Sequence, residues 1–149
     1  MNKLQALTQF IIELDLVAVE NIDTWMEEPR IKPIGRQETA NCILLFQNEY
    51  DAVFSIERFP HKRHSPNVLF GNICTWLMTE DCERDENAQP RTDVDILDDD
   101  VADVEITISF TEDVYAIKDV NGDILYNGEQ YRLADAAEID IAEDGSVTT

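Results

Sequence analysis

Lysine and arginine are scarce in this chain of 149 residues. There are 11 of them against 32 aspartates and glutamates, which gives a formal net charge of −21 at pH 7. A protein that binds DNA or RNA on its own needs clustered cations that displace the counterions of the phosphates. An anionic membrane surface repels an acidic chain for a related reason. The shortage of cations therefore argues against a sequence-specific nucleic-acid binder and against a membrane-surface protein.

Long hydrophobic runs are also lacking. The longest, from Cys42 to Phe46, has the length of a strand and falls far short of the roughly 18 apolar residues that a helix needs to cross a bilayer. The segment from Met1 to Leu4 leads straight into a patterned region without a secretory apolar stretch, so we expect the protein to stay in the cytosol. Three cysteines without a Cys-x-x-Cys pair indicate reduced thiols rather than a disulfide framework.

Motifs for catalysis and metal binding are absent or incomplete. The chain has no Gly-x-Ser-x-Gly element, phosphate loop or dinucleotide fingerprint. Six aspartates lie between Asp93 and Asp103, but their spacing fits no calcium loop. His61 and His64 lack cysteine partners at the usual zinc spacing. We therefore expect no enzyme activity, no cofactor and no metal site, and interpret the aspartate cluster as a solvated turn.

The N-terminal quarter of the chain carries helical periodicity. Four apolar residues from Leu4 to Leu14 fall on one stripe, which predicts a helix over 2–16. The spacing between Asn21 and Pro29 predicts a second, shorter helix that ends before the proline. The segment 30–39 contains a proline and a glycine that break any period, so a loop is predicted there.

Strand patterns dominate the rest of the chain. They lie at 41–47, 52–59, 94–96, 104–110, 114–118, 124–126 and 129–133. A polar stretch between the first two runs predicts a hairpin. The alternation of the third and fourth runs predicts antiparallel strands with one solvated face. The Asn-Gly pairs at 121–122 and 127–128 predict tight turns.

A central helix over 66–80 is the clearest single prediction. Ser65 supplies an N-cap, and Pro66 stands at the first helical position. Gly71 inside this helix costs roughly 1 kcal/mol relative to alanine, which indicates close packing of its backbone. A basic loop at 59–64 precedes the helix, and an acidic loop at 80–90 follows it.

The order of these elements predicts an α+β fold, in which an N-terminal helix and a central helix pack on a mainly antiparallel sheet. The length is that of one domain, which we assign to 1–133. The segment 134–149 has few core candidates and many acidic residues, so we expect a flexible acidic tail there.

Charge is distributed unevenly along the chain. Residues 1–79 carry a net charge of −3, whereas residues 80–149 carry −18. A basic loop on one side of a subunit and an acidic edge on another suit the head-to-tail contacts of a closed ring. A solvated acidic surface that keeps the protein soluble is the alternative. The residues that we expect in a subunit or partner interface are Arg30, Lys32, Arg36, Arg58, Lys62, Arg63, Asp98, Asp99 and Asp100.

The strand and helix pattern resembles a phage protein family. The residues that carry the likeness are the runs 42–47 and 52–57, the Trp76-Leu77 pair that closes the central helix, and the run 104–112. They are similar to tail completion protein R of Peduovirus-type contractile-tailed phages and prophages, and the likeness covers roughly residues 30–118. The resemblance implies a structural protein without catalysis, located at the head-proximal end of the virion tail and assembled in the bacterial host cytoplasm.

The resemblance also implies the partners. They are other copies of the chain in a ring, expected to be a hexamer, the tail tube and sheath proteins, and head-side connector or neck proteins. Such a ring caps the finished tail, ends its polymerisation and prepares head–tail joining. An acidic mimic of DNA that inhibits a DNA-binding protein is the alternative, consistent with the net charge but not with a basic loop. A calcium-dependent adaptor is a third reading, which rests on the aspartate cluster alone.

Overall fold

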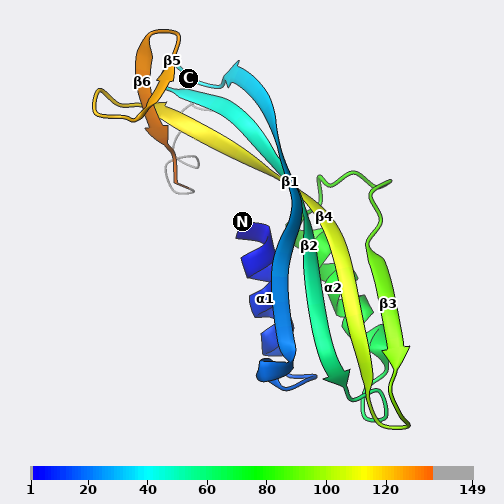
Figure 1. The fold of residues 1–149 in the computed structure, drawn as a ribbon. Coiled ribbons are helices and arrows are strands. Elements are labelled where there is room, and N and C mark those ends of the chain that lie inside the picture. Colours follow the sequence, from blue (N-terminus) through cyan, green and yellow to red (C-terminus); the bar gives the residue numbers. More distant parts are fainter. Residues whose placement is uncertain (1, 136–149) are drawn as a thin grey trace. The chain divides into compact units, whose positions relative to one another are not determined.

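A computed structural model of the chain describes residues 2–135, in which two helices, a short 3-10 turn and six strands follow one another (Figure 1). The elements are α1 (Asn2–Leu14), η1 (Val19–Asn21), β1 (Ile22–Gln37), β2 (Cys42–Phe59), α2 (Pro66–Glu80), β3 (Arg91–Ile96), β4 (Ala102–Lys118), β5 (Ile124–Tyr126) and β6 (Glu129–Leu133). The strands form a sheet in the order β1-β2-β4-β6-β5, and β3 also pairs with β4. The β3–β4, β4–β6 and β5–β6 pairs are antiparallel. The predicted α+β class is confirmed.

The chain divides into two compact units that share the three long strands. Within the described residues, the first, here called the helical unit, comprises residues 2–29 and 50–111, and the second, here called the sheet unit, comprises residues 30–49 and 112–135. β1, β2 and β4 each contribute one part to each unit. Most of the tail predicted over 134–149 lies outside the described residues, because the description ends at residue 135.

The helical unit has two layers. Its helices α1 and α2 lie on one face of the sheet, and the other face is open (Figure 1). The core between the layers consists of Leu7, Ile11, Tyr50, Ala52, Phe54, Ile56, Phe59, Leu69, Ile73, Leu77, Val104, Ile106, Ile108 and Phe110. Alternate residues of β2 from Tyr50 to Ile56 and of β4 from Val104 to Phe110 contribute to it, as expected for strand segments with one face toward the helices. Val53 is also buried, on the opposite face of β2. The ring of Phe110 packs against Tyr50 and Trp76, with centroids 5.9 and 6.3 Å away.

The sheet unit has a much smaller core. Within its described residues, Ile43, Ala116 and Tyr131 are buried together, and Leu45, Ile124 and Tyr126 pack against them. Tyr126 and Tyr131 meet edge to face, with ring centroids 6.1 Å apart. No helix covers this sheet in the described part of the chain, so the unit depends on cross-strand pairs and turns.

Two glycines shape the turns of the sheet unit. Asn127 and Gly128 both have positive φ, 52° and 76°, which is the conformation of the two-residue turn predicted there. At the other predicted turn, the backbone N–H of Gly122 donates to Asp119 O at 2.8 Å. A Cβ on Gly122 would lie 2.1 Å from the carbonyl oxygen of Tyr131, so only glycine fits beside β6.

The predicted central helix is confirmed, including its cap. α2 spans Pro66–Glu80, and the backbone N–H of Asn67 donates to the Ser65 hydroxyl at 3.2 Å. The inference of close packing at Gly71 is wrong, because no atom outside the local helix backbone lies within 4 Å of the place its Cβ would take. The outer surface of α2 is open at this point.

The predictions for residues 21–39 are also wrong. The short helix and the loop are one strand, β1, which runs through both prolines of this region. β1 pairs only with β2 in the strand order and is therefore an edge strand, where a proline without an N–H is tolerated. Ile22 and Thr24 are partly buried, whereas Asp23 and Trp25 are exposed. Ile22 and Trp25, whose spacing suggested one face of a helix, therefore lie on opposite faces of β1.

The predicted hairpin over 41–59 is a single strand, β2, and the polar residues 48–51 lie within it. Their alternation explains the error. Tyr50 is buried, whereas Asp51 faces the other side and accepts a hydrogen bond from the Ser109 hydroxyl of β4 at 2.8 Å. The runs 104–110 and 114–118 are likewise parts of one strand, β4. The sequence pattern does not reveal that the three long strands pass from one unit into the other.

Candidate functional site

The cations predicted for an interface fall into two groups in different units. Those of the sheet unit, on β1, are Arg30, Lys32 and Arg36, and those of the helical unit, at the end of β2 and in the following loop, are Arg58, Lys62 and Arg63. Arg30 pairs with Glu49 at 3.8 Å, and Arg36 pairs with Glu38 at 2.9 Å. Both are exposed pairs, which contribute little to stability.

The predicted aspartates lie beside the basic loop of the same copy. Asp98, Asp99 and Asp100 form the turn between β3 and β4. Lys62 Nζ lies 3.4 Å from Asp100 Oδ1, and His61 Nε2 lies 2.9 Å from the backbone oxygen of Asp98. The loop cations and the turn aspartates thus meet within one chain.

The carboxylate of Asp98 shapes this turn. Its Oδ1 accepts the backbone N–H groups of Asp100 at 2.8 Å and of Val101 at 2.9 Å. These two hydrogen bonds are the main reason that the pKa of Asp98 lies below its ordinary value of 3.8, and the positive charge of Arg58 contributes. The Asp98 carboxyl is therefore ionised at neutral pH.

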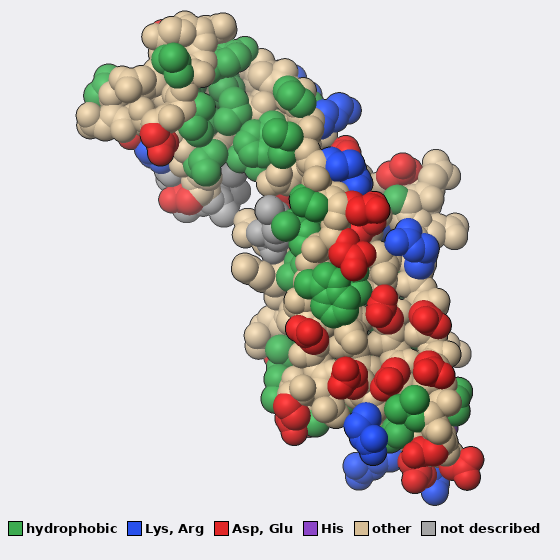
Figure 2. All heavy atoms as spheres, in the orientation of Figure 1, with side chains coloured by type: hydrophobic (Ala, Val, Ile, Leu, Met, Phe, Trp, Pro, Cys, Tyr) green, Lys and Arg blue, Asp and Glu red, His purple; other side chains and the backbone are tan. Residues whose placement is uncertain are grey.

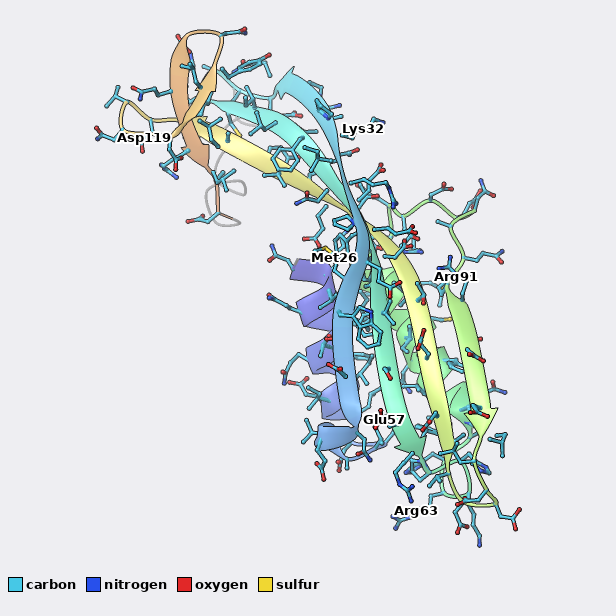
Figure 3. The ribbon with its side chains drawn as sticks, in the orientation of Figure 1. Met26, Lys32, Glu57, Arg63, Arg91 and Asp119 are labelled. Atoms are coloured by element: carbon cyan, nitrogen blue, oxygen red, sulfur yellow. The ribbon has the colours of Figure 1, made fainter. Side chains whose placement is uncertain are left out.

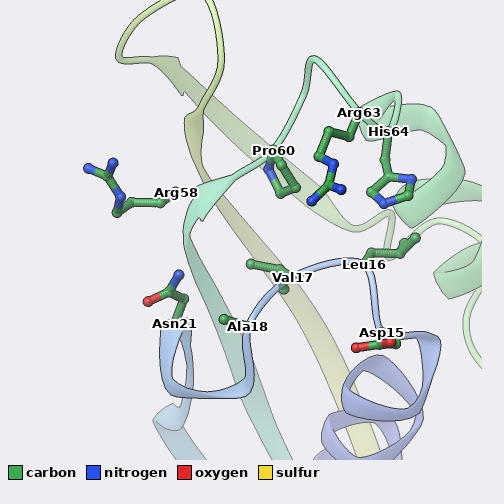
Figure 4. A pocket seen from close by; sticks show the side chains of 9 residues that line it. All are labelled: Asp15, Leu16, Val17, Ala18, Asn21, Arg58, Pro60, Arg63 and His64. Atoms are coloured by element: carbon green, nitrogen blue, oxygen red, sulfur yellow. The ribbon is translucent and has the colours of Figure 1, made fainter.

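A groove of about 610 Å³ opens at this end of the helical unit (Figure 4). We call it the cationic groove. It is lined by Asp15, Leu16, Val17, Ala18, Asn21, Arg58, Pro60, Arg63 and His64, from the segment between α1 and β1 and from the segment between β2 and α2. Arg63, His64 and Asn21 contribute a guanidinium, an imidazole and an amide to the lining, whereas the guanidinium of Arg58 extends away from them (Figure 4). Asp15 is the single carboxylate of the lining. Such a lining favours an anionic ligand.

The two arginines of the groove form no ion pair within residues 2–135. The backbone of Arg58 is fixed, because its N–H donates to the carboxylate of Asp103 at 3.0 Å. Arg58 has a φ of 54°, in the left-handed region that non-glycine residues seldom adopt. Asp103 therefore holds Arg58 in an unfavourable backbone conformation while its side chain stays exposed.

The open face of the sheet in the helical unit is acidic (Figure 2). Strand alternation places eight carboxylates there: Asp23, Glu27, Asp51, Glu57, Asp93, Asp95, Asp103 and Glu105. Trp25 lies on the same face, and its Nε1–H donates to Glu27 at 3.0 Å. Figure 3 shows Glu57 on this sheet and Arg63 near the loop end of the same unit.

The register of β3 and β4 sets like charges against each other. Asp93 lies directly opposite Glu105, and Asp95 lies directly opposite Asp103. We call these four residues the acidic strand pair. Like charges in directly opposed positions destabilise a sheet. Of these four carboxylates, Asp103 also accepts the backbone N–H of Arg58 at 3.0 Å.

Comparison with known proteins identifies the family. The sequence profile of the P2 phage tail completion protein R (GpR) family matches residues 1–135. The chain belongs to this family. It is therefore a phage tail completion protein, which confirms the family inferred from the strand and helix pattern. The match extends beyond the residues that carried the resemblance, because it includes the N-terminal helix and the β5–β6 pair.

A relative from another phage is consistent with the GpR family assignment. The chain is 34% identical over 143 residues to an uncharacterized 19.2 kDa protein of the rep-hol intergenic region of Haemophilus phage HP1 (strain HP1c1). The alignment covers 94% of this chain and 86% of the relative. No solved structure matches the chain.

A buried ion cluster that sequence reasoning missed stabilises this GpR-family fold. Asp81, at the end of α2, is 5% exposed. It accepts Lys3 Nζ at 2.7 Å and Arg84 Nη1 at 2.9 Å. Lys3 also donates to Thr111 O at 2.6 Å, and Arg84 to Ala88 O at 2.6 Å. The cluster thus connects α1, the end of α2, the acidic loop and β4.

Within the described residues, no group of three or more His, Cys, Asp or Glu side chains is arranged to hold a metal ion. None of the helices in that range is long and apolar enough to span a membrane. The cysteines Cys74 and Cys82 are exposed, and Cys42 is buried.

Sequence reasoning found some residues of the two charged surfaces and missed others. It named Arg58 and Arg63 but not Asn21 or Asp15, because neither of these two residues stands in a recognisable motif. The acidic face was visible only as an aspartate cluster around the β3–β4 turn. The strict alternation of carboxylates with Val104 and Ile106 in β4 was the available signal for a charged open face.

Proposed function

We propose that copies of this chain assemble into a ring that caps the tail tube and sheath, ends tail polymerisation and prepares the tail for joining to the head. The expected ring is a hexamer at the head-proximal end of the tail, built in the cytoplasm of the bacterial host. Its partners are the tube and sheath proteins and the head-side connector or neck proteins. The role requires binding surfaces and no catalysis.

One observation supports a ring above other assemblies. The helical unit carries a cationic groove at its loop end and an acidic face on the open side of its sheet. Two distinct surfaces of opposite charge on one subunit favour a head-to-tail contact, and repetition of that contact closes a ring when the rotation fits.

The sheet unit is the surface that we assign to the tail. It exposes Ile31, Val120, Leu125 and Leu133, each more than half accessible, and carries Lys32 on β1, which forms no ion pair within residues 2–135. Exposed apolar side chains with a cationic rim are typical of surfaces that another protein covers.

The test uses phage tails from a lysogen whose copy of this gene carries a stop codon. We expect tails without a defined head-proximal end, and restoration of one end per tail when purified full-length protein is added. Electron microscopy with a gold label on the protein gives its position. Light scattering gives the assembly mass, and six subunits of 17.0 kDa would give about 102 kDa.

Label along the whole tube, or tails of normal ends and length without the protein, would contradict the capping role. A monomer that does not associate with tubes at any concentration would contradict the ring.

The acidic open face supports a second candidate, a mimic of DNA. Eight carboxylates on one sheet face resemble a row of phosphates in charge. This reading predicts that a purified DNA-binding protein binds the chain in competition with duplex DNA and releases it as salt is raised. The family assignment and the cationic groove favour the tail role.

A further inference from the structure

We propose that the cationic groove of one copy docks on the acidic strand pair of a second copy. The groove contributes Arg58 and Arg63, and the strand pair contributes Asp93, Asp95, Asp103 and Glu105. The inference rests on the proposed function, since it names the contact from which the ring is built.

The lining of the groove favours carboxylates as ligands. Acidic residues outnumber basic ones almost three to one in this chain, and seven of the eleven cations form ion pairs within residues 2–135. Two of the remaining four, Arg58 and Arg63, line the same groove. In a chain this acidic, most charged residues near a given guanidinium are carboxylates. Two arginines without an ion pair in one groove therefore indicate that their carboxylate partners come from another copy.

The acidic strand pair has the complementary character. Its register opposes Asp93 to Glu105 and Asp95 to Asp103, so the isolated copy bears two repulsive pairs in adjacent positions of one strand ladder. A guanidinium placed over either pair would remove that repulsion. The contact is therefore favourable for both surfaces. It gives the arginines carboxylate partners, and it reduces the repulsion between β3 and β4.

Other ways of joining two copies are less favourable. Within the helical unit, the free edges of the sheet are β1 and β3. Pairing them would extend the sheet from copy to copy, but both edges carry carboxylates, among them Glu27 and Asp93. Such a junction would add like-charge contacts to those already present. A nucleic acid in the groove is opposed by the 20 acidic residues of the helical unit, against six basic ones.

The positions of the two surfaces determine the symmetry. The groove lies where α1 and β2 end, and the acidic strand pair lies on the face that the helices leave open. The two surfaces adjoin at the hydrogen bond from Arg58 N–H to Asp103, and Asp93 and Glu105 lie further along the strands. We expect a copy that docks through its groove to keep Asp93 and Glu105 available for a third copy. This contact is head-to-tail and forms a ring on closure, not a two-fold dimer.

The test reverses the charge of each surface in the full-length chain. The groove variant carries Arg58→Glu and Arg63→Glu, and the strand variant carries Asp93→Lys and Glu105→Lys. The strand variant exchanges one like-charge cross-strand pair for another, so the repulsion within the sheet is kept. Ring assembly alone and on purified tail tubes is measured by sedimentation velocity. We expect each variant to need at least about tenfold more protein than wild type for half-assembly.

Mixing the two variants supplies the decisive measurement. In an equimolar mixture, each intact groove meets an intact strand pair, and each reversed groove meets a reversed strand pair. We expect rings to reappear with the two variants alternating, which requires an even number of subunits. Failure of the mixture to assemble better than either variant alone would overturn the pairing.

Arg36→Glu is the matched control. Arg36 lies in the sheet unit, outside both the groove and the acidic strand pair, and its exposed ion pair with Glu38 contributes little to stability. Its reversal changes the net charge as much as one groove substitution does, and we expect assembly to stay within about twofold of wild type. Loss of assembly equal to that of the groove variant would overturn a specific groove contact. Thermal unfolding of every variant checks that the fold is kept.

The outcomes separate the inference from the proposed function. If wild-type protein forms rings and both reversed variants form them equally well, the groove contact is wrong and the capping ring stands. If wild-type protein forms no ring, either alone or on tubes, the proposed function fails and this contact fails with it.

Discussion

The helical unit and the sheet unit are made from the same three strands, yet they are stabilised differently. In the helical unit two helices cover one sheet face, and 14 buried side chains form its core. In the described part of the sheet unit three buried side chains form a cluster, Cys42 and Leu44 are buried as well, and no helix covers this unit. The difference teaches that a long strand acquires stability locally, from what packs on each part of it.

The two units also differ in the side chains that they expose to solvent. The open face of the helical unit carries eight carboxylates (Figure 2), whereas the most exposed large apolar side chains among the described residues, Val120 and Leu125, belong to the sheet unit. A stable body can bear a repulsive surface, and a weakly packed part gains most from a partner that covers it.

Phe110→Ala tests the role of the larger core. The substitution removes a ring that contacts Tyr50 and Trp76 and leaves a cavity, so we expect a loss of about 3–5 kcal/mol in the free energy of unfolding. Both tryptophans belong to the helical unit, and their fluorescence in a urea titration reports on that unit. Tyr131→Ala, in the small core, is the comparison. An equal shift of the tryptophan transition in both variants would show that the units unfold as one.

Asp81→Ala tests the buried ion cluster of the helical unit. Lys3 and Arg84 would lose their shared carboxylate, and we expect a loss of about 3 kcal/mol. Calorimetric unfolding measures it. Asp81→Asn keeps the volume and serves as the control for packing. If both variants unfold at the wild-type temperature, the cluster contributes nothing to stability.

Gly122→Ala tests the sheet unit alone. The added methyl meets the Tyr131 carbonyl at 2.1 Å, so the turn must shift, at a cost of about 1–3 kcal/mol. Hydrogen exchange should accelerate in β5 and β6 while the amides of α2 keep their protection. Gly71→Ala is the control, because a Cβ there meets nothing within 4 Å and should stabilise α2 by about 0.5–1 kcal/mol. Faster exchange throughout the chain would contradict independent units.

The smallest expected effects are changes of stability with pH, from one group in each unit. The pKa of Asp98 is lowered by backbone hydrogen bonds, so its contribution to stability is present above pH 3.8 and is lost as the pH falls through the folded pKa. The pKa of Lys118 is raised by the hydrogen bond to Glu129, so its contribution is present below pH 10.5 and is lost as the pH rises through the folded pKa. Carbon NMR titrations of the two side chains check both directions. Titration of either group at its ordinary value would contradict them.

The sequence predicts the elements whose signals are local. Ser65 and Pro66 fix the start of α2, and the alternation around Val104 predicts an antiparallel strand with one open face. β1 escapes prediction because its prolines are tolerated only at a sheet edge, and edge position is a property of the whole sheet. The continuity of β2 escapes it because its central polar residues look like a turn.

The charged surfaces were predictable in composition and not in arrangement. Arg58 and Arg63 stand out as cations in an acidic chain. That they line one groove with Asn21, which comes from a distant segment, depends on the tertiary fold. The opposition of Asp93 and Glu105 depends on a strand register that no local pattern encodes.

The like charges opposed across β3 and β4 also govern collisions between free copies. Two molecules that meet with their open faces together bring eight carboxylates against eight, and they separate before short-range contacts form. Exposed antiparallel sheets otherwise invite stacking and edge growth into aggregates. The same carboxylates thus make misoriented collisions brief. A copy stays bound only where its cations contact the carboxylates of another copy.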